Sequence, residues 1–126
     1  MDKKAIKDIS RLKIILKYCD KIEEVMNEYG KDVEDFLENP RYQDLCCFYT
    51  QQIGENAKNI SKQITRKHPE IRWEDMRETR NDIAHIYEWI DLEMIWGAIN
   101  EDVPILKETC EKILIELEAS DRSHKF

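Results

Sequence analysis

Apolar residues recur at steps of three and four along most of this chain, and this spacing constrains the fold more than any other feature. An α-helix brings residues three and four apart onto one face, whereas a half-buried strand needs alternation at every second residue. No segment alternates convincingly with a period of two. The first stripe, between residues 3 and 28, consists of Ile9, Leu12, Leu16, Cys19, Ile22 and Met26. The spacing therefore predicts an all-α protein.

Further apolar stripes predict three more long helices and one short helix. Their expected bounds are about 40–67, 72–87 and 91–118 for the long helices and about 32–38 for the short one. The phase of the last stripe continues through Pro104, so we expect one helix with a kink at that proline. The expected fold is an antiparallel bundle of four long helices plus a short helix.

Residues suited to helix ends stand at several of the expected boundaries. Gly30 is a suitable stop for the first helix, and Asp32 is a possible cap for the short one. Asn39 is a suitable N-cap before Pro40, which is tolerated in a first helical turn. Pro69 disfavours helix in the residue before it, so the helix that begins at Pro40 must end close to that point.

Length and charge limit the organisation of the chain and its partners. A chain of 126 residues fits a single domain, with a core at about 3–118 and a frayed tail at 119–126. The formal net charge of −7 argues against holding duplex nucleic acid by broad charge neutralisation. Basic residues nevertheless gather in one stretch, where any polyanion site is expected: Lys58, Lys62, Arg66, Lys67, Arg72, Arg77 and Arg80.

The cysteines indicate a reducing compartment, and the hydropathy pattern indicates a protein that does not span a membrane. Cys19, Cys46, Cys47 and Cys110 lie in or beside apolar stripes and lack C-x2-C spacing, so we expect buried free thiols. With three histidines and no H-E-x-x-H pattern, we expect no metal site and no cofactor. No apolar run reaches transmembrane length and no signal-peptide pattern is present, so the expected location is the cytoplasm.

The segment 72–91 concentrates the side chains that could carry chemistry. On a helix, Arg80 shares a face with Trp73, Met76 and Tyr87, so a cation stands on an otherwise apolar stripe. Buried arginine is uncommon unless it is paired with a carboxylate or takes part in binding or catalysis. The alternatives are an arginine that reaches the edge of the core or pairs with a carboxylate, and a tyrosine that belongs to the core.

His85 follows Arg80 by five residues, which places the two about 140° apart around a straight helix. A long arginine side chain, a local unwinding or a second subunit would have to bring them together. Asn81 lies one turn before His85 and Asp82 three residues before it, so either could orient the imidazole. The alternative is an ordinary surface or packing histidine. These residues define a polar cluster without specifying an activity.

The same segment resembles the HepT-like branch of the HEPN superfamily. The motif R-x4-H-x-Y reads here as Arg80-Asn-Asp-Ile-Ala-His85-Ile-Tyr87. One departure is Ile86, which stands where the family often has glycine. The resemblance covers about residues 45–118 and includes three flanking blocks in the family's order: Gln52–Ser61, His68–His85 and Asp91–Glu108, the last with its proline.

This resemblance implies a fold, an activity and partners. It implies a HEPN-like homodimer that acts as the toxin of a toxin–antitoxin pair, with an MntA-like nucleotidyltransferase as its antitoxin. The implied activity is metal-independent endoribonuclease cleavage of tRNA or mRNA. His85 would be the general acid or base and Arg80 the group that holds the phosphate and stabilises the transition state. Asn81 and Asp82 would support His85.

Tyr87 has a further implied role, as the hydroxyl to which the antitoxin transfers AMP. Trp73 or Tyr87 could also stack an unpaired base. The main alternative to an enzyme is a non-catalytic helical module that binds a nucleotidyltransferase partner, and the acidic charge balance favours it slightly. A nucleotide-binding regulator is a third, weaker alternative.

Overall fold

The computed structural model describes residues 2–76 and 91–124 of the chain. Within these ranges the secondary structure is helical, without strands, which confirms the predicted all-α fold. In chain order the elements are α1 (Lys3–Tyr29), α2 (Val33–Leu37), α3 (Pro40–Ala57), α4 (Lys62–Lys67), α6 (Leu92–Gly97), the π-helical segment η2 (Ala98–Asp102) and α7 (Val103–His124).

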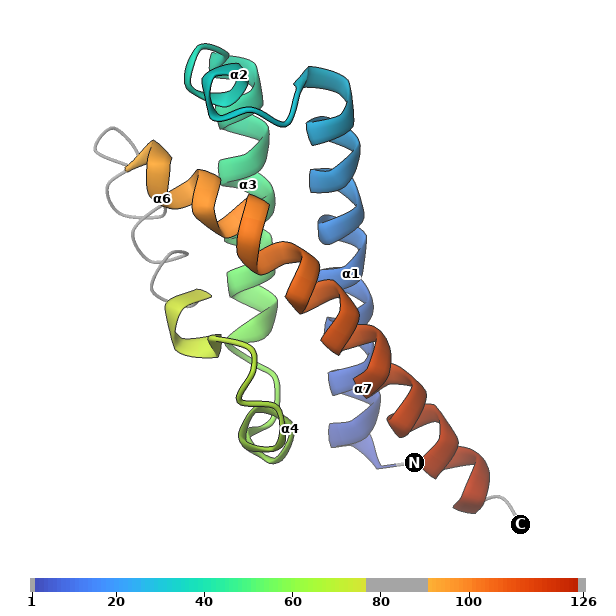
Figure 1. Cartoon of the computed structure of the whole chain (residues 1–126). Helices are drawn as coiled ribbons and strands as arrows, with labels where there is room; N and C mark the ends of the chain where they lie inside the picture. The colour runs from blue at the N-terminus through green and yellow to red at the C-terminus, as the bar shows by residue number, and fades with distance from the viewer. Residues whose placement is uncertain (1, 77–90, 125–126) are drawn as a thin grey trace.

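Two long helices form the base of the fold, and a third crosses them. α1 and α3 lie side by side and run in opposite directions (Figure 1). α6, η2 and α7 form one continuous helical ribbon that passes obliquely over this pair, with α7 packed on α1 and α6 packed on α3. α2 lies at one end of the α1–α3 pair and α4 at the other (Figure 1).

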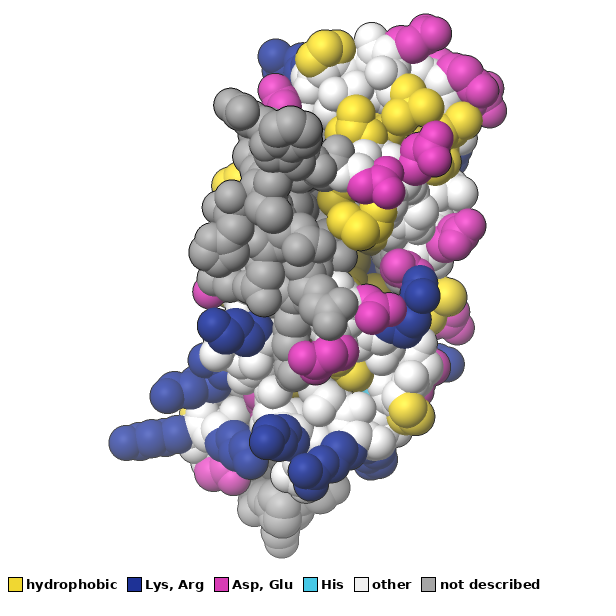
Figure 2. Space-filling view, turned by 90° about the vertical axis from the view of Figure 1, so that its left-hand side faces the viewer, with side chains coloured by type: hydrophobic (Ala, Val, Ile, Leu, Met, Phe, Trp, Pro, Cys, Tyr) yellow, Lys and Arg dark blue, Asp and Glu magenta, His cyan; other side chains and the backbone are white. Residues whose placement is uncertain are grey.

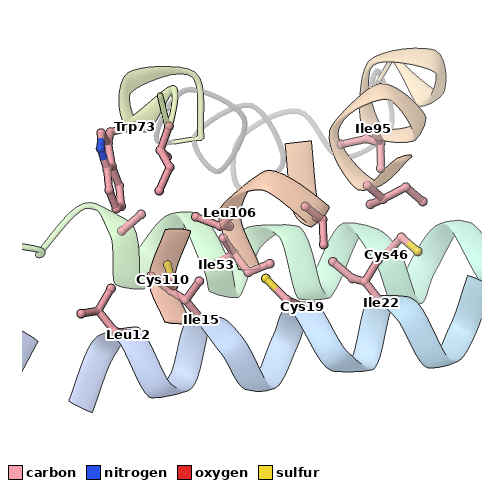
Figure 3. Close-up of a cluster of buried hydrophobic side chains, with 14 of the residues drawn as sticks. Leu12, Ile15, Cys19, Ile22, Cys46, Ile53, Trp73, Ile95, Leu106 and Cys110 are labelled. Carbon is pink, nitrogen blue, oxygen red and sulfur yellow. The ribbon is translucent and has the colours of Figure 1, made fainter. Parts of the chain in front are cut away.

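The core lies between these layers. On α1 the buried face comprises Leu12, Ile15, Cys19 and Ile22, which are fully inaccessible. Figure 3 shows this row beside side chains of α3 and α7, among them Ile53 and Cys110. The predicted stripe of α1 is confirmed at Leu12, Cys19, Ile22 and Met26, whereas Ile9 and Leu16 are only partly buried. The prediction omitted Ile15 and Val25, which are buried.

The cysteines are part of this core. All four are buried and free, as the sequence predicts. Burial raises the pKa of Cys46 and of Cys110 to about 12, and that of Cys47 to about 11. Burial also raises the pKa of Cys19 far above its ordinary range. The thiols are therefore protonated and packed as small apolar groups at neutral pH.

Several helix ends follow the predicted local signals. α1 ends at Gly30, whose φ of 121° favours glycine and whose N–H donates to Met26 O at 2.9 Å. α3 begins at Pro40, and the Asn39 side chain accepts a hydrogen bond from the Tyr42 N–H at 3.2 Å.

The prediction of one helix over 40–67 is wrong, because the chain leaves the helix between α3 and α4. Two side chains of α1 form hydrogen bonds with backbone groups at this break. The buried Asp8 carboxylate accepts the Ser61 N–H at 3.0 Å, and Arg11 Nη1 donates to Asn59 O at 2.8 Å. These bonds compensate for the helical hydrogen bonds that the break removes.

We expect Asp8→Ala to lower the free energy of unfolding by about 1–3 kcal/mol, because the Ser61 N–H would lose its partner in a part-buried place. Urea denaturation followed by circular dichroism measures this difference. The matched control is Glu24→Ala, which removes an exposed carboxylate from the same helix and should change stability by less than about 0.5 kcal/mol. Equal effects of the two substitutions would contradict the assigned role of Asp8.

The last long helix contains a π-helical segment close to Pro104, where the sequence predicts a kink. Asp91 caps its start, accepting hydrogen bonds from the N–H groups of Glu93 at 3.0 Å and Met94 at 3.3 Å. The π-helical segment η2 ends at Asp102, two residues before Pro104. Proline has no N–H and its ring crowds the carbonyl four residues earlier, so a wider turn at this point relieves both problems. The helix then continues to His124, beyond the predicted end at 118.

Candidate functional site

The residues of the R-x4-H-x-Y motif lie outside the described residues. This applies to Arg80, Asn81, Asp82, His85 and Tyr87, so their predicted roles stay predictions. The structure instead defines the two ends of the segment that carries them. We call residues 77–90 the motif segment; the described chain stops before it at Met76 and resumes after it at Asp91. The contacts of the residues next to these two points show how each end is attached to the core.

The upstream end is fixed in the core by Trp73. This side chain is buried, and its Nε1–H donates a hydrogen bond to His68 O at 3.0 Å. Residues 73–76 are helical, and Met76 packs against the core. The predicted helix therefore begins at the expected place, and the first two positions of its predicted apolar face do meet the core.

Arg72 connects the same end to η2. Its Nη2 lies 2.7 Å from Asp102 Oδ1, and its Nη1 lies 3.5 Å from Asp75 Oδ2. The hydrogen bond with Asp102 raises the pKa of Arg72 above its already high ordinary value. Because η2 belongs to the ribbon that starts at Asp91, both ends of the motif segment are attached to one continuous helical element (Figure 1).

The downstream end rests on an aromatic cluster. Trp96 of α6 packs against Phe36 of α2, with ring centroids 5.6 Å apart, and against Tyr42 of α3, at 6.4 Å. Ile95, the neighbouring residue of α6, is fully buried. The short helix α2 therefore supports the point at which the chain leaves the motif segment.

His68 holds the turn that leads into this segment, a role that its loop position in the sequence did not reveal. Its side chain is 12% exposed and lies between two carboxylates. Nδ1 is 3.1 Å from Glu70 Oε1, and Nε2 is 3.7 Å from Glu116 Oε2 on α7. The pKa of Glu70 is lowered, first by a hydrogen bond to its own backbone and then by the one to His68.

Charge is unevenly distributed over the described surface. Figure 2 shows Lys and Arg side chains gathered in the lower part of one face, with Asp, Glu and apolar side chains above them. The described members of the predicted basic stretch are all exposed: Lys58, Lys62, Arg66, Lys67 and Arg72.

Among the described residues, no group of His, Cys, Asp and Glu has an arrangement that could hold a metal ion. None of the helices in the described ranges has the length and apolar character needed to span a bilayer.

Comparison with known proteins defines the family. The model of the family described as Ribonuclease HepT-like matches residues 15–113. A Thermococcus cleftensis protein named "Probable ribonuclease HepT" is 35% identical over 92 residues, which are 71% of this chain and 84% of that protein. The chain belongs to the HepT-like ribonuclease family.

Two proteins of Methanocaldococcus jannaschii are also similar. One, named "Putative RNase MJ0125", is 32% identical over 106 residues, which are 82% of this chain and 88% of that protein. The other, named "Gamma-glutamylcyclotransferase and putative RNase MJ0434", is 31% identical over 117 residues, 91% of this chain but 52% of that protein. No solved structure matches this chain.

Proposed function

We propose that this protein is a cytoplasmic toxin that cleaves RNA as a metal-independent endoribonuclease. The observation that supports this most is the complete R-x4-H-x-Y motif, Arg80, His85 and Tyr87, in a chain of the HepT-like ribonuclease family. The exposed basic surface formed by residues 58–72, which precede the motif in the sequence, also supports it, because an RNA substrate is a polyanion.

In the proposed reaction, His85 removes the proton from a ribose 2′-hydroxyl. The 2′-oxygen attacks the adjacent phosphorus, the bond to the 5′-oxygen breaks, and a protonated histidine returns a proton to that oxygen. The products are a 2′,3′-cyclic phosphate and a free 5′-hydroxyl. Arg80 binds the phosphate oxygens and stabilises the charge that develops on them. Asn81 and Asp82 orient the imidazole.

The proposed active form is a homodimer. On one straight helix Arg80 and His85 point about 140° apart, so a single copy does not readily bring both to one phosphate. Two copies that pair through their motif segments supply an arginine from one chain opposite a histidine from the other. They also supply two histidines, one for the base and one for the acid.

The experiment that tests this function is incubation of total RNA and purified tRNA with the protein in EDTA, followed by analysis of the new ends. We expect cleavage that persists in EDTA and leaves 2′,3′-cyclic phosphate ends, since the mechanism needs no metal. Cleavage only after addition of a divalent ion would contradict the mechanism. No cleavage by an unmodified dimer would favour the non-catalytic module that binds a nucleotidyltransferase.

The proposed partner is an MntA-like nucleotidyltransferase antitoxin that transfers AMP to the hydroxyl of Tyr87. The added nucleotide would block the site through its bulk and negative charge. We expect the protein co-expressed with this partner to gain the mass of AMP, and Tyr87→Phe to abolish the gain. Intact-mass spectrometry measures both. An inactive complex with unmodified mass would show inhibition by binding alone.

A further inference from the structure

Helix α4 and the turn before it form a cationic surface without acidic residues. From residue 56 to residue 69 the chain has four Lys and Arg residues and no Asp or Glu, although its overall charge is −7. α4 contacts the core through Ile64, which is buried. Lys58, Lys62, Arg66 and Lys67 are all exposed around it.

The ion pairs separate the basic residues of this region into two groups. Arg72 is held by Asp102 at 2.7 Å, and Lys67 Nζ lies 3.8 Å from Glu116 Oε2. Within the described part of the chain, Lys58, Lys62 and Arg66 form no ion pair. These three side chains are therefore available to a ligand.

Stability of the fold does not account for these cations. Arg66 in the last turn of α4 interacts favourably with the helix dipole, but Lys62 is the first residue of α4, where a cation is unfavourable. Lys62 and Arg66 are four residues apart and therefore neighbours on one helical face, where like charges destabilise a helix by roughly 0.2–0.5 kcal/mol. These cations lower the stability of α4 without a structural benefit, which indicates that they bind a ligand.

This surface continues to residues 69–75. A shallow, open hollow of about 530 Å³ is lined by Arg66 of α4 and by residues of the segment 69–75, among them Pro69 and Trp73. Glu74 and Asp75 also line it, and Asp75 pairs with Arg72. Arg66 thus borders the same hollow as residues 69–75, which precede the motif in the sequence.

We propose that Lys58, Lys62 and Arg66 bind the phosphates of single-stranded RNA next to the cleavage site. This inference rests on the proposed function and extends it to a substrate-binding surface outside the motif. Single-stranded RNA fits because separate, flexible cations can follow a flexible phosphate chain, and Arg66 borders the hollow that residues 69–75 also line.

The test compares Lys62→Ala/Arg66→Ala with a control, Lys17→Ala/Lys31→Ala, which removes the same charge from exposed positions on α1 and in the turn before α2. That turn is at the opposite end of the molecule from α4 (Figure 1). The probe is a labelled single-stranded 2′-O-methyl RNA of mixed sequence, which lacks the attacking hydroxyl and therefore reports binding without cleavage. Circular dichroism verifies that both variants fold.

We expect the α4 variant to bind the probe about tenfold more weakly and the control to bind like the wild type. A plot of log affinity against log salt concentration should become shallower by about 1.4 for the α4 variant, since each phosphate contact on a single strand contributes about 0.7. The charge-conserving Lys62→Arg/Arg66→Lys variant should retain wild-type binding, because point charges suffice for phosphate contacts.

Unchanged binding by the α4 variant, or an equal loss in the control, would overturn the inference and leave the proposed ribonuclease activity intact. Loss of binding by the α4 variant, in a wild-type protein that binds RNA without cleaving it, would support the surface and contradict the activity. A wild-type protein that does not bind the probe at low salt would overturn both.

Discussion

Replacing His85 with alanine is expected to lower RNA cleavage by about 10²–10⁴-fold, because the reaction would lose the group that moves the proton of the 2′-hydroxyl. Initial rates of cleavage of a labelled RNA in EDTA measure this effect. Binding of a non-cleavable RNA should change little, because the imidazole acts in the transition state and the phosphates are held by cations. The loss should therefore appear in kcat more than in KM.

A matched control for His85→Ala is His124→Ala, at the end of α7. This substitution should leave the rate unchanged, since the residue lies outside the motif. Arg80→Lys gives an additional comparison, because lysine keeps the charge and loses the bidentate geometry. We expect it to reduce cleavage substantially. A His85→Ala protein that cleaves RNA at the wild-type rate would refute the proposed chemistry.

Replacing Phe36 with alanine is expected to lower the free energy of unfolding by about 3–5 kcal/mol. Phe36 is fully buried, and its ring meets Tyr42 edge-on at a centroid distance of 5.1 Å and Trp96 at 5.6 Å. The helix that carries it has five residues, too few to be stable alone, so its place in the fold depends on this contact. Alanine would leave a cavity between α2, α3 and α6.

Urea denaturation measures the loss, with Leu37→Ala as the matched control from the same short helix. Leu37 is 38% exposed, so its truncation should cost less than about 1 kcal/mol. In a thermal scan, Phe36→Ala should lower Tm by roughly 10–20 °C for a domain of this size. Similar losses from the two substitutions would show that α2 is not anchored through Phe36.

This cluster also links stability to the site. Trp96 belongs to α6, which begins directly after the motif segment, so a cavity beside its ring would loosen the downstream end of that segment. At the upstream end, Trp73 and Arg72 have the same supporting role through His68 and Asp102. The residues on both sides of the motif are thus attached to the core of the fold.

The sequence by itself determined the helical class, the end of α1 at Gly30 and the start of α3 at Pro40. These features depend on interactions within a few residues, which spacing and capping residues report directly. It also determined the family, and the positions of Arg80, His85 and Tyr87 in its motif. The placement of these three side chains in space stays a prediction.

Only the tertiary structure decided where the predicted helix over 40–67 breaks and which cations of residues 2–76 and 91–124 form no ion pair. The break depends on Asp8, which is 53 residues from its partner Ser61. The pairing of Arg72 depends on Asp102, which is 30 residues away. Periodicity cannot select partners at such separations, because they are brought together by the packing of α1 and of the helix through η2 against the rest of the core.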